Sequence, residues 1–278
     1  MTTEAGAKVE GTIESADGTR LAYRTWPVSG ANITFAVVHG LGEHSGRYER
    51  FARGMAKHGM EVYALDLRGH GQSAGQRGHV DSWSQWVDDA AGFIGHVEGM
   101  AANEVVPLGH SFGGAVLLST VLAGRLPRSR RFVVSSPALI AKVAVPGWKI
   151  SLGNFTSGIA PRLSLSNEVD PKAVSRIPEV VEAYRSDPLV HSKISSRTFT
   201  EWQKATKDIL ARADEIKQPF LIVAGADDQL IDPQGSEALH AKAAKLSELH
   251  ILSGRYHEPF NDLGDEEVYR LIADWLRR

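Results

Sequence analysis

The sequence GHSFGG at residues 109–114 is a short motif that indicates both a local structure and a reactive side chain. An apolar run at 105–108 precedes it, and apolar residues at helical spacing follow it. We therefore expect a strand, a sharp turn and a helix with Ser111 at the bend, which is the nucleophile-elbow pattern GxSxG. Glycines beside the serine let strand and helix backbones approach closely around a strained turn. Because GxSxG also occurs by chance, it indicates a nucleophile only if a base, an acid and an oxyanion hole accompany it.

Strand and helix patterns alternate on both sides of this motif. Two strand-like runs at 9–15 and 19–26 are joined by an Asp-Gly turn, so we expect the fold to open with antiparallel strands. Further strands are expected at 33–38, 61–66, 105–108, 131–135, 219–224 and 248–252, and helices at 48–58, 82–100, 114–124, 233–244 and 265–277. Such alternation predicts an α/β protein with a mostly parallel sheet.

The alternation stops near residue 137 and resumes only at the strand 219–224. The segment between is rich in proline and has helical patches at 178–186 and 199–213. We interpret residues 138–215 as a helical cap, or lid, inserted into a single domain of residues 1–278. Its apolar start at 139–145 either packs on the sheet domain, lines an acyl pocket or touches a lipid surface.

Composition narrows the function classes. A chain of 278 residues with 42% hydrophobic side chains can bury a large core. Its net charge of -2 indicates neither a nucleic-acid-binding surface nor a polybasic patch for anionic lipid. The absence of cysteine excludes disulfides, thiolate metal sites and a cysteine nucleophile. No apolar run approaches the about 20 residues of a membrane span, and the start lacks the apolar core of a signal peptide. We expect a soluble, cytoplasmic protein whose function lies in a small-molecule site.

A serine hydroxyl needs a base within hydrogen-bonding reach and an acid that holds the base in one tautomer. On sheets of this kind the three residues follow in the order Ser, Asp or Glu, His. Asp227 and Asp228 come just after the strand 219–224, where parallel sheets place their sites. We choose Asp228 as the acid over Asp227 and over Asp232.

His257 follows the next strand in a loop at the same edge of the sheet, whereas His250 lies inside that strand and is assigned a structural role. Ser111, Asp228 and His257 are thus the expected catalytic triad. The oxyanion hole is expected from the backbone N–H groups of Phe112, after the nucleophile, and Leu41, in the loop after the strand 33–38.

Two other features suggest cofactors. The sequence GHGQSA at 69–74 mimics a dinucleotide-binding fingerprint, but it does not follow the first strand and no helix pattern follows it. The eleven histidines include no HExxH and no other metal-ligand spacing. We expect neither a cofactor nor a metal.

Several stretches together resemble the monoacylglycerol lipase and lysophospholipase branch of the α/β hydrolases. They are HGLGEHSGRY at 39–48, DLRGHGQS at 66–73, GHSFGG at 109–114, YRSDPL at 184–189 and YHE at 256–258. The resemblance begins near residue 12 and covers most of the chain. It implies an eight-stranded, mostly parallel sheet with helices on both faces and a helical cap. It also implies the triad Ser111, Asp228 and His257, with Leu41 and Phe112 at the oxyanion hole.

The resemblance further implies that Glu43 and Tyr184 hold the glycerol end of a substrate. For Glu43 the alternative is a loop acid that pairs with Arg47 four residues later. For Tyr184 the alternative is a place in the core of the cap. Phe112 stands where many relatives have methionine, and the cap residues diverge, so acyl-chain preference is not implied.

The expected activity is cofactor-free hydrolysis of monoacylglycerols to fatty acid and glycerol through an acyl-enzyme. A broader carboxylesterase, an arylesterase or a lysophospholipase is the alternative within enzymes. A ligand-binding protein of the same fold is the alternative outside them, and the complete triad argues against it. The expected partner is a small ester or lipid, with transient contact of the cap to a lipid surface.

Overall fold

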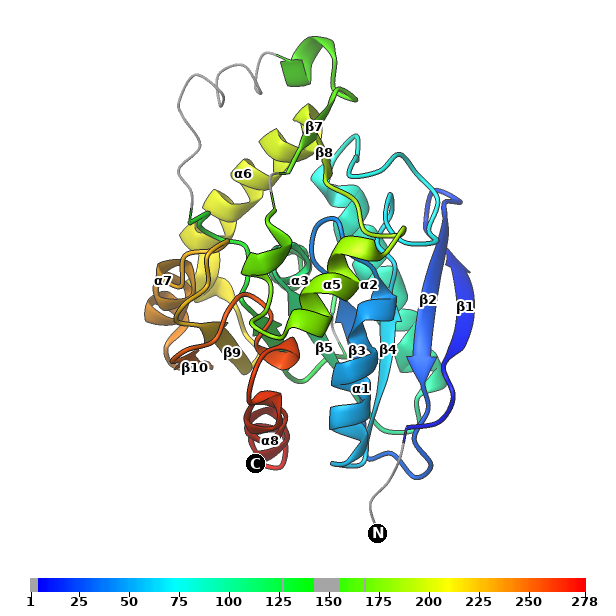
Figure 1. Cartoon of the computed structure of the whole chain (residues 1–278), viewed down its shortest axis with the longest axis vertical. Coiled ribbons are helices and arrows are strands. Elements are labelled where there is room, and N and C mark those ends of the chain that lie inside the picture. Colours follow the sequence, from blue (N-terminus) through cyan, green and yellow to red (C-terminus); the bar gives the residue numbers. More distant parts are fainter. Residues whose placement is uncertain (1–4, 127, 143–155, 168) are drawn as a thin grey trace.

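Within the residues that the computed structural model describes, 5–126, 128–142, 156–167 and 169–278, eight strands form one sheet (Figure 1). Their order across the sheet is β1-β2-β4-β3-β5-β6-β9-β10. The strands are β1 (Val9–Glu14), β2 (Arg20–Trp26), β3 (Ile33–Val38), β4 (Met60–Leu65), β5 (Glu104–His110), β6 (Phe132–Ser135), β9 (Phe220–Gly225) and β10 (Ser247–Leu252). β2 pairs antiparallel with both β1 and β4, and every other pairing in this sheet is parallel. The predicted mostly parallel sheet with antiparallel N-terminal strands is confirmed.

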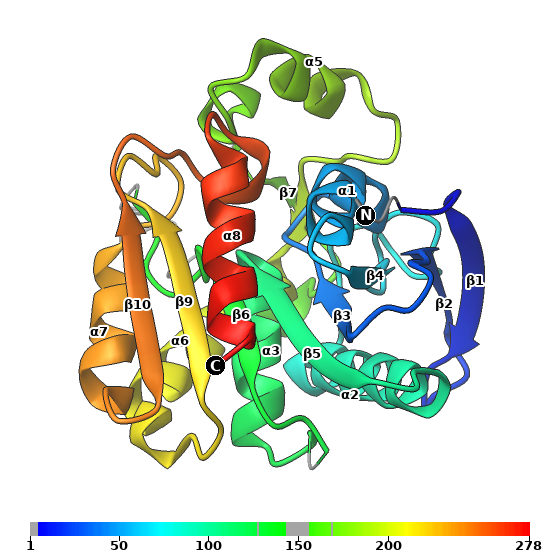
Figure 2. The same cartoon turned by 90° about the horizontal axis from the view of Figure 1, so that it is seen from below.

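Helices cover both faces of the sheet (Figure 2). α1 (Glu49–Ala56) and α8 (Asp265–Leu276) pack on one face, and α2 (Trp83–Met100), α3 (Phe112–Leu122), α6 (Ser196–Arg212) and α7 (Gln234–Ala243) pack on the other. In β3, Phe35 and Val37 point toward α1, whereas Ala36 and Val38 point toward α2 and α3. Alternate side chains of one strand therefore fill two cores, which explains its uninterrupted apolar sequence.

Local capping decides where the predicted helices begin. α2 starts at Trp83 because the Ser82 and Gln85 side chains form a capping box around its first turn. The helix expected at 48–58 is instead a 3-10 turn, η1 (Ser45–Tyr48), followed by α1. The helix expected from 199 starts at Ser196, since the Ser195 hydroxyl accepts a hydrogen bond from the Thr198 N–H at 3.1 Å. Among the described helices, none is long and apolar enough to cross a bilayer.

The segment between β6 and β9, called the insertion below, contains β7 (Ser164–Ser166), η2 (Pro171–Ala173), α5 (Pro178–Ser186), β8 (Lys193–Ser195), α6 and η3 (Ala213–Glu215). Figure 2 shows α5 at the top of that view, above α8 and α1. β7 and β8 pair as an antiparallel ribbon that we did not predict, because strands of three residues carry too little alternation. The apolar run at 139–145 lies partly outside the described residues; Leu139 is buried and Ile140 is exposed.

Two glycines of the GHSFGG motif stand where backbones nearly touch. A methyl group at Gly113 would overlap the carbonyl oxygens of Val38 and His39 at the end of β3. A methyl group at Gly109 would lie 2.6 Å from the carbonyl oxygen of Gly113. The first turn of α3 therefore packs directly against β3 and β5, and only glycine allows this approach.

We expect Gly113→Ala to destabilise the protein by at least about 1–3 kcal/mol, because the added methyl group forces backbone segments apart. Gly95→Ala is the matched control, since Gly95 is exposed on α2 and a methyl group there meets no atom within 4 Å. That change should stabilise the helix by up to about 1 kcal/mol. Urea unfolding followed by circular dichroism measures both, and equal stability of the two variants would contradict the packing described for α3.

Candidate active site

Ser111 occupies the turn between β5 and α3 with φ 52° and ψ -120°. A non-glycine residue in such a conformation costs about 1–3 kcal/mol, which the surroundings must offset. The Ser111 N–H donates to the Ser135 carbonyl at 2.9 Å, and its carbonyl accepts from Gly114 and Ala138, each at 2.9 Å. These bonds fix the turn and leave the half-buried hydroxyl facing the carboxyl edge of the sheet.

Three residues predicted from separate parts of the sequence meet at this edge. The His257 Nε2 atom lies 2.9 Å from the Ser111 Oγ atom, and its Nδ1 atom lies 2.7 Å from Asp228 Oδ2. Asp228 Oδ1 accepts from the backbone N–H groups of Leu230 and Ile231 at 2.8 and 3.0 Å. With Nδ1–H donating to the carboxylate, Nε2 is free to accept the serine proton.

The electrostatics of the site favour a charged acid and a basic histidine. Burial tends to lower the pKa of His257, but the charge of Asp228 and its hydrogen bond raise it above the ordinary value of 6.5. Burial tends to raise the pKa of Asp228, but His257 and the two backbone donors hold it below its ordinary value. His110 packs against His257 with ring centres 4.9 Å apart, and burial lowers its pKa to about 4, so it is neutral at pH 7.

The other residues weighed in the sequence lie elsewhere. Asp227 is exposed, and Asp232 accepts a hydrogen bond from the Gln234 N–H at 3.0 Å at the start of α7. His250 lies on β10, where its Nε2 atom is 2.8 Å from a Glu248 carboxylate oxygen. The GHGQSA loop is tied to the sheet instead of opening a phosphate site: the Gln72 N–H donates to Asp66 at 2.7 Å, next to Gly71.

The loop after β3 runs beside Ser111. A methyl group at Gly40 would lie 3.2 Å from the Ser111 Cβ atom, so the following residue, Leu41, is close to the serine. Phe112 is the first residue of α3, and an N–H at that position has no acceptor within its own helix. The Phe112 side chain is buried against the rings of Trp83 and Trp86, with centres 5.2 and 5.0 Å away. The side chain is therefore part of the core, and the backbone N–H lies at the turn that carries Ser111.

Glu43 and Tyr184 both contact Arg47. Glu43 is buried and accepts from Arg47 Nη1 at 2.8 Å, which is the pairing that its spacing also allowed. The Arg47 guanidinium carbon lies 4.5 Å from the centre of the buried Tyr184 ring. Sequence reasoning missed Glu258, which binds Arg47 through two hydrogen bonds of 2.6 and 2.9 Å. Its position directly after His257 was the available signal.

Comparison with known proteins assigns the family. The family model described as "Hydrolase_4: Serine aminopeptidase, S33" matches residues 31–264. The chain belongs to this family. A monoacylglycerol lipase of Mycolicibacterium smegmatis is 33% identical over 93% of this chain and 93% of its own length. An abhydrolase domain-containing protein of Dictyostelium discoideum is 33% identical over 95% of this chain, which spans 28% of that protein.

The crystal structure of a monoacylglycerol lipase from Paleococcus ferrophilus is similar throughout. It is 32% identical, the alignment covers 97% of this chain and 98% of that one, and the TM-score is 0.80. These similarities confirm the resemblance to the monoacylglycerol lipase branch and the α/β-hydrolase fold. The protein is a serine hydrolase of the lipase and esterase type.

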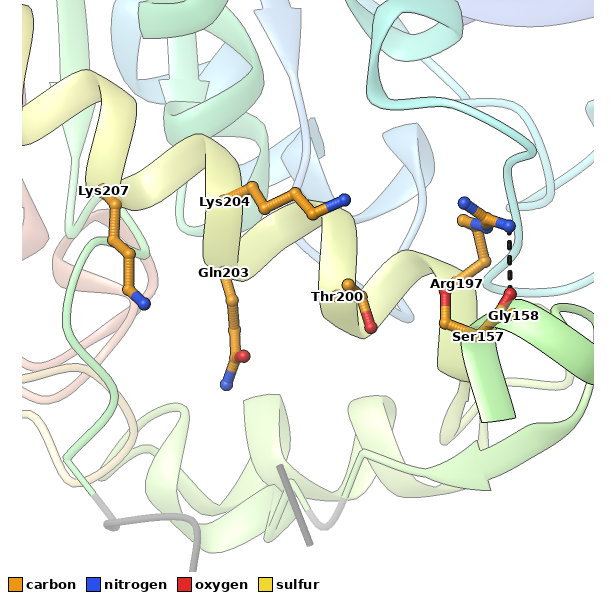
Figure 3. A pocket seen from close by; sticks show the side chains of 7 residues that line it. All are labelled: Ser157, Gly158, Arg197, Thr200, Gln203, Lys204 and Lys207. Carbon is orange, nitrogen blue, oxygen red and sulfur yellow. Dashed lines mark hydrogen bonds between the residues drawn. The ribbon is translucent and has the colours of Figure 1, made fainter. Parts of the chain in front are cut away.

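Two hollows of the described structure have polar linings. One, of about 520 Å³, lies beside Asp228 and is lined by Lys142, Ala226, Asp227, Asp228, Gln229 and Tyr256. The other, of about 400 Å³, lies along α6 (Figure 3) and is lined by Ser157, Gly158, Arg197, Thr200, Gln203, Lys204 and Lys207. Neither of these two has the apolar wall that an acyl chain requires.

Asp228→Asn should lower the pKa of His257 by about 1–3 units, because an opposite charge at hydrogen-bonding distance is lost while burial remains. An NMR titration of the His257 ring measures this directly, without reference to activity. Asp227→Asn is the matched control and should leave the pKa unchanged, since Asp227 is exposed. Equal titration of His257 in the two variants would contradict the assignment of Asp228 as its partner.

Proposed function

We propose that the protein hydrolyses carboxylic esters through an acyl-enzyme, with Ser111 as nucleophile, His257 as general base and Asp228 as the residue that orients it. The observation that carries this proposal is the continuous hydrogen-bonded chain from Ser111 Oγ through His257 to Asp228, at 2.9 and 2.7 Å. Both distances are within the range that proton transfer requires before a substrate binds. The elbow serine, the family and the residue order all agree with this chemistry.

In the first step, Ser111 Oγ attacks the ester carbonyl carbon while its proton moves to His257 Nε2. The carbonyl oxygen becomes negative, and the N–H groups of Leu41 and Phe112 are proposed to bind it. The tetrahedral intermediate collapses, and His257 gives its proton to the leaving alcohol. In the second step, His257 takes a proton from water, whose oxygen attacks the acyl-serine carbonyl carbon. As this second tetrahedral intermediate collapses, His257 returns the proton to Ser111 Oγ and the fatty acid leaves. Asp228 stays ionised and stabilises the imidazolium in both steps.

Monoacylglycerols are the proposed substrate class, which would be split into a fatty acid and glycerol. Support comes from the lipase of Mycolicibacterium smegmatis, similar over nearly its whole length, and from the fold match to the Paleococcus ferrophilus lipase. We further propose that Glu43 and Tyr184 border the glycerol end of the substrate. This proposal is supported by their contacts with Arg47, which also pairs with Glu258, the residue after His257.

The alternatives differ in which ester is cleaved fastest. A broad carboxylesterase or arylesterase prefers short-chain aryl esters, and a lysophospholipase prefers an ester with a phosphodiester head. Comparison of kcat/KM for a long-chain monoacylglycerol, a short-chain aryl ester and a lysophospholipid separates them. We expect the monoacylglycerol to give the highest value.

Ser111→Ala should lower kcat by several orders of magnitude, on the order of 10⁵ or more, while the fold remains intact. A fluorophosphonate should label the wild-type protein at one serine, Ser111, and should not label this variant. Ser186→Ala is the matched control, since Ser186 is an exposed serine on α5. Near-wild-type hydrolysis by Ser111→Ala would overturn the mechanism, and unlabelled wild-type protein would favour a ligand-binding protein instead.

We also propose that the insertion contacts a lipid surface. Three large apolar side chains close together in its sequence are exposed: Ile159 is 69% exposed, Leu163 47% and Leu165 45%. The basic hollow in Figure 3 lies on the same insertion, with Lys204 and Lys207 on α6. Apolar side chains that enter the interface and lysines that attract anionic head groups are the two features of peripheral lipid binding. The near-neutral net charge of the whole chain conceals this local excess of cations.

The variant Leu163→Ser/Leu165→Ser should bind phosphatidylcholine vesicles containing phosphatidylglycerol less tightly than the wild type. Leu263→Ser is the matched control, because Leu263 is equally exposed (51%) but precedes α8 and lies outside the insertion. Each lysine near an anionic surface contributes about 1 kcal/mol, so Lys204→Gln/Lys207→Gln should weaken binding roughly 10- to 30-fold. Vesicle co-sedimentation measures these affinities. Equal loss from Leu263→Ser would contradict a contact through the insertion.

A further inference from the structure

A buried group of charged and aromatic side chains lies beside the proposed catalytic residues without being one of them. It consists of Glu43, Arg47, Glu258 and Tyr184, and we call it the Arg47 cluster. The Arg47 side chain is only 8% exposed; Glu43 lies four residues before it, whereas Tyr184 and Glu258 come from distant parts of the chain. A buried guanidinium is stable only if its donors are satisfied, so each of these contacts constrains the segment that supplies it.

The first contact fixes the loop that carries His257. Arg47 Nη1 and Nη2 donate to the two carboxylate oxygens of Glu258 at 2.6 and 2.9 Å, a two-point pairing that sets orientation as well as distance. Asn261 Nδ2 donates to the same carboxylate at 2.9 Å. Because Glu258 directly follows His257, this pairing also restricts the backbone of the histidine.

The second contact fixes the loop that carries Leu41. Arg47 Nη1 donates to Glu43 Oε2 at 2.8 Å, and Glu43 Oε1 accepts from the Gly40 N–H at 2.6 Å. Gly40 lies against Ser111 and precedes Leu41. A chain of hydrogen bonds therefore runs from the histidine loop, through Arg47, to the residue before the proposed oxyanion donor.

The third contact comes from the insertion. The Tyr184 ring on α5 covers the Arg47 guanidinium at 4.5 Å, a favourable cation–π geometry. Two hydrogen bonds join the same parts of the chain: His44 Nε2 lies 2.8 Å from Asp187 Oδ2, and the His191 N–H donates to the Gly42 carbonyl at 2.8 Å. The stretch 184–191 thus contacts the loop at 42–47 at three points.

We propose that Arg47 is a positioning residue. It joins the loop that carries Leu41 to the loop that carries His257, and the insertion holds it in place through Tyr184. The inference rests on the proposed function, in which Leu41 and His257 act on the same substrate carbonyl. Two groups on separate loops must keep their separation within about 0.5 Å for efficient catalysis. Arg47 itself touches no reacting atom.

The same cluster changes the electrostatics of His257. Its ring faces Asp228 and neutral His110 directly, and the charges of Glu258 and Glu43 also raise its pKa, whereas Arg47, which pairs with both carboxylates, lowers the pKa of the adjacent His110. The two cluster carboxylates outweigh the single guanidinium, so the cluster leaves a net negative charge near the imidazole. Loss of the Arg47 charge should raise the pKa of His257, and loss of the Glu258 charge should lower it.

The test is the second-order rate of fluorophosphonate labelling at Ser111, which depends on both loops but not on which ester is the natural substrate. Arg47→Met should be labelled at least about tenfold more slowly than the wild type. The decrease should be smaller than the about 10²–10³-fold decrease in rate that loss of an oxyanion donor causes. Arg47→Lys should fall between, since an ammonium cannot bind both oxygens of Glu258 in the same way. Arg53→Met is the matched control, because Arg53 pairs with Glu49 on the exposed side of α1.

Two further variants separate positioning from loss of folding. Tyr184→Leu keeps Arg47 and both carboxylates, and it should label several-fold more slowly than Tyr184→Phe, which keeps the ring. The labelling rate should fall at acid pH as His257 becomes protonated, and we call this fall the acid limb of the pH profile. The acid limb should move to higher pH in Arg47→Met and to lower pH in Glu258→Gln. A purely structural role lowers the active fraction without moving that limb in opposite directions.

Wild-type rates in folded Arg47→Lys and Tyr184→Leu, or an unchanged acid limb in Glu258→Gln, would overturn the positioning role while the proposed function stands. Wild-type protein that is not labelled at Ser111 would overturn the proposed function, and the inference with it. Slow labelling with opposite pH shifts supports both.

Discussion

The close approach of three backbone segments around Ser111 is the constraint on which the rest of the site depends. The end of β3, the end of β5 and the first turn of α3 meet where Gly109 and Gly113 leave room for carbonyl oxygens. This contact holds the serine in its left-handed conformation and places the loop after β3 beside it. The parallel strand order brings the other two residues to this point, since the turn after β9 carries Asp228 and the loop after β10 carries His257.

Much of this arrangement could be predicted from the sequence because its signals are local. The apolar runs of the buried strands, the helical periodicities and the Asp-Gly turn each depend on neighbouring residues, and they place the sheet and its helices within a few residues. Ser111, Asp228 and His257 could be named because each lies in the turn or loop that follows a strand, and strands of a parallel sheet end at one edge. The choice between Asp228 and Asp227 agrees with the observed bond to His257.

What escaped prediction depends on contacts between distant residues. Arg47 and Glu258 are 211 positions apart, and neither carries a sequence pattern that identifies the other. The spacing of Glu43 and Arg47 predicted that they could form a salt bridge. It could not predict that Arg47 also pairs with Glu258 and so joins two loops. The β7–β8 ribbon was missed because its strands are short, and the cations of α6 were hidden in a balanced total charge.

The hydrogen bond between the His191 N–H and the Gly42 carbonyl bears on how such proteins diversify and are engineered. Because the insertion is bonded to the loop at 42–47 as well as covering the sheet edge, it is not an exchangeable module. A graft that replaces it with the corresponding segment of a relative keeps both loops in register only if the complementary residues of 39–48 are transferred with it. The backbone contact between His191 and Gly42 therefore couples the two segments in any such exchange.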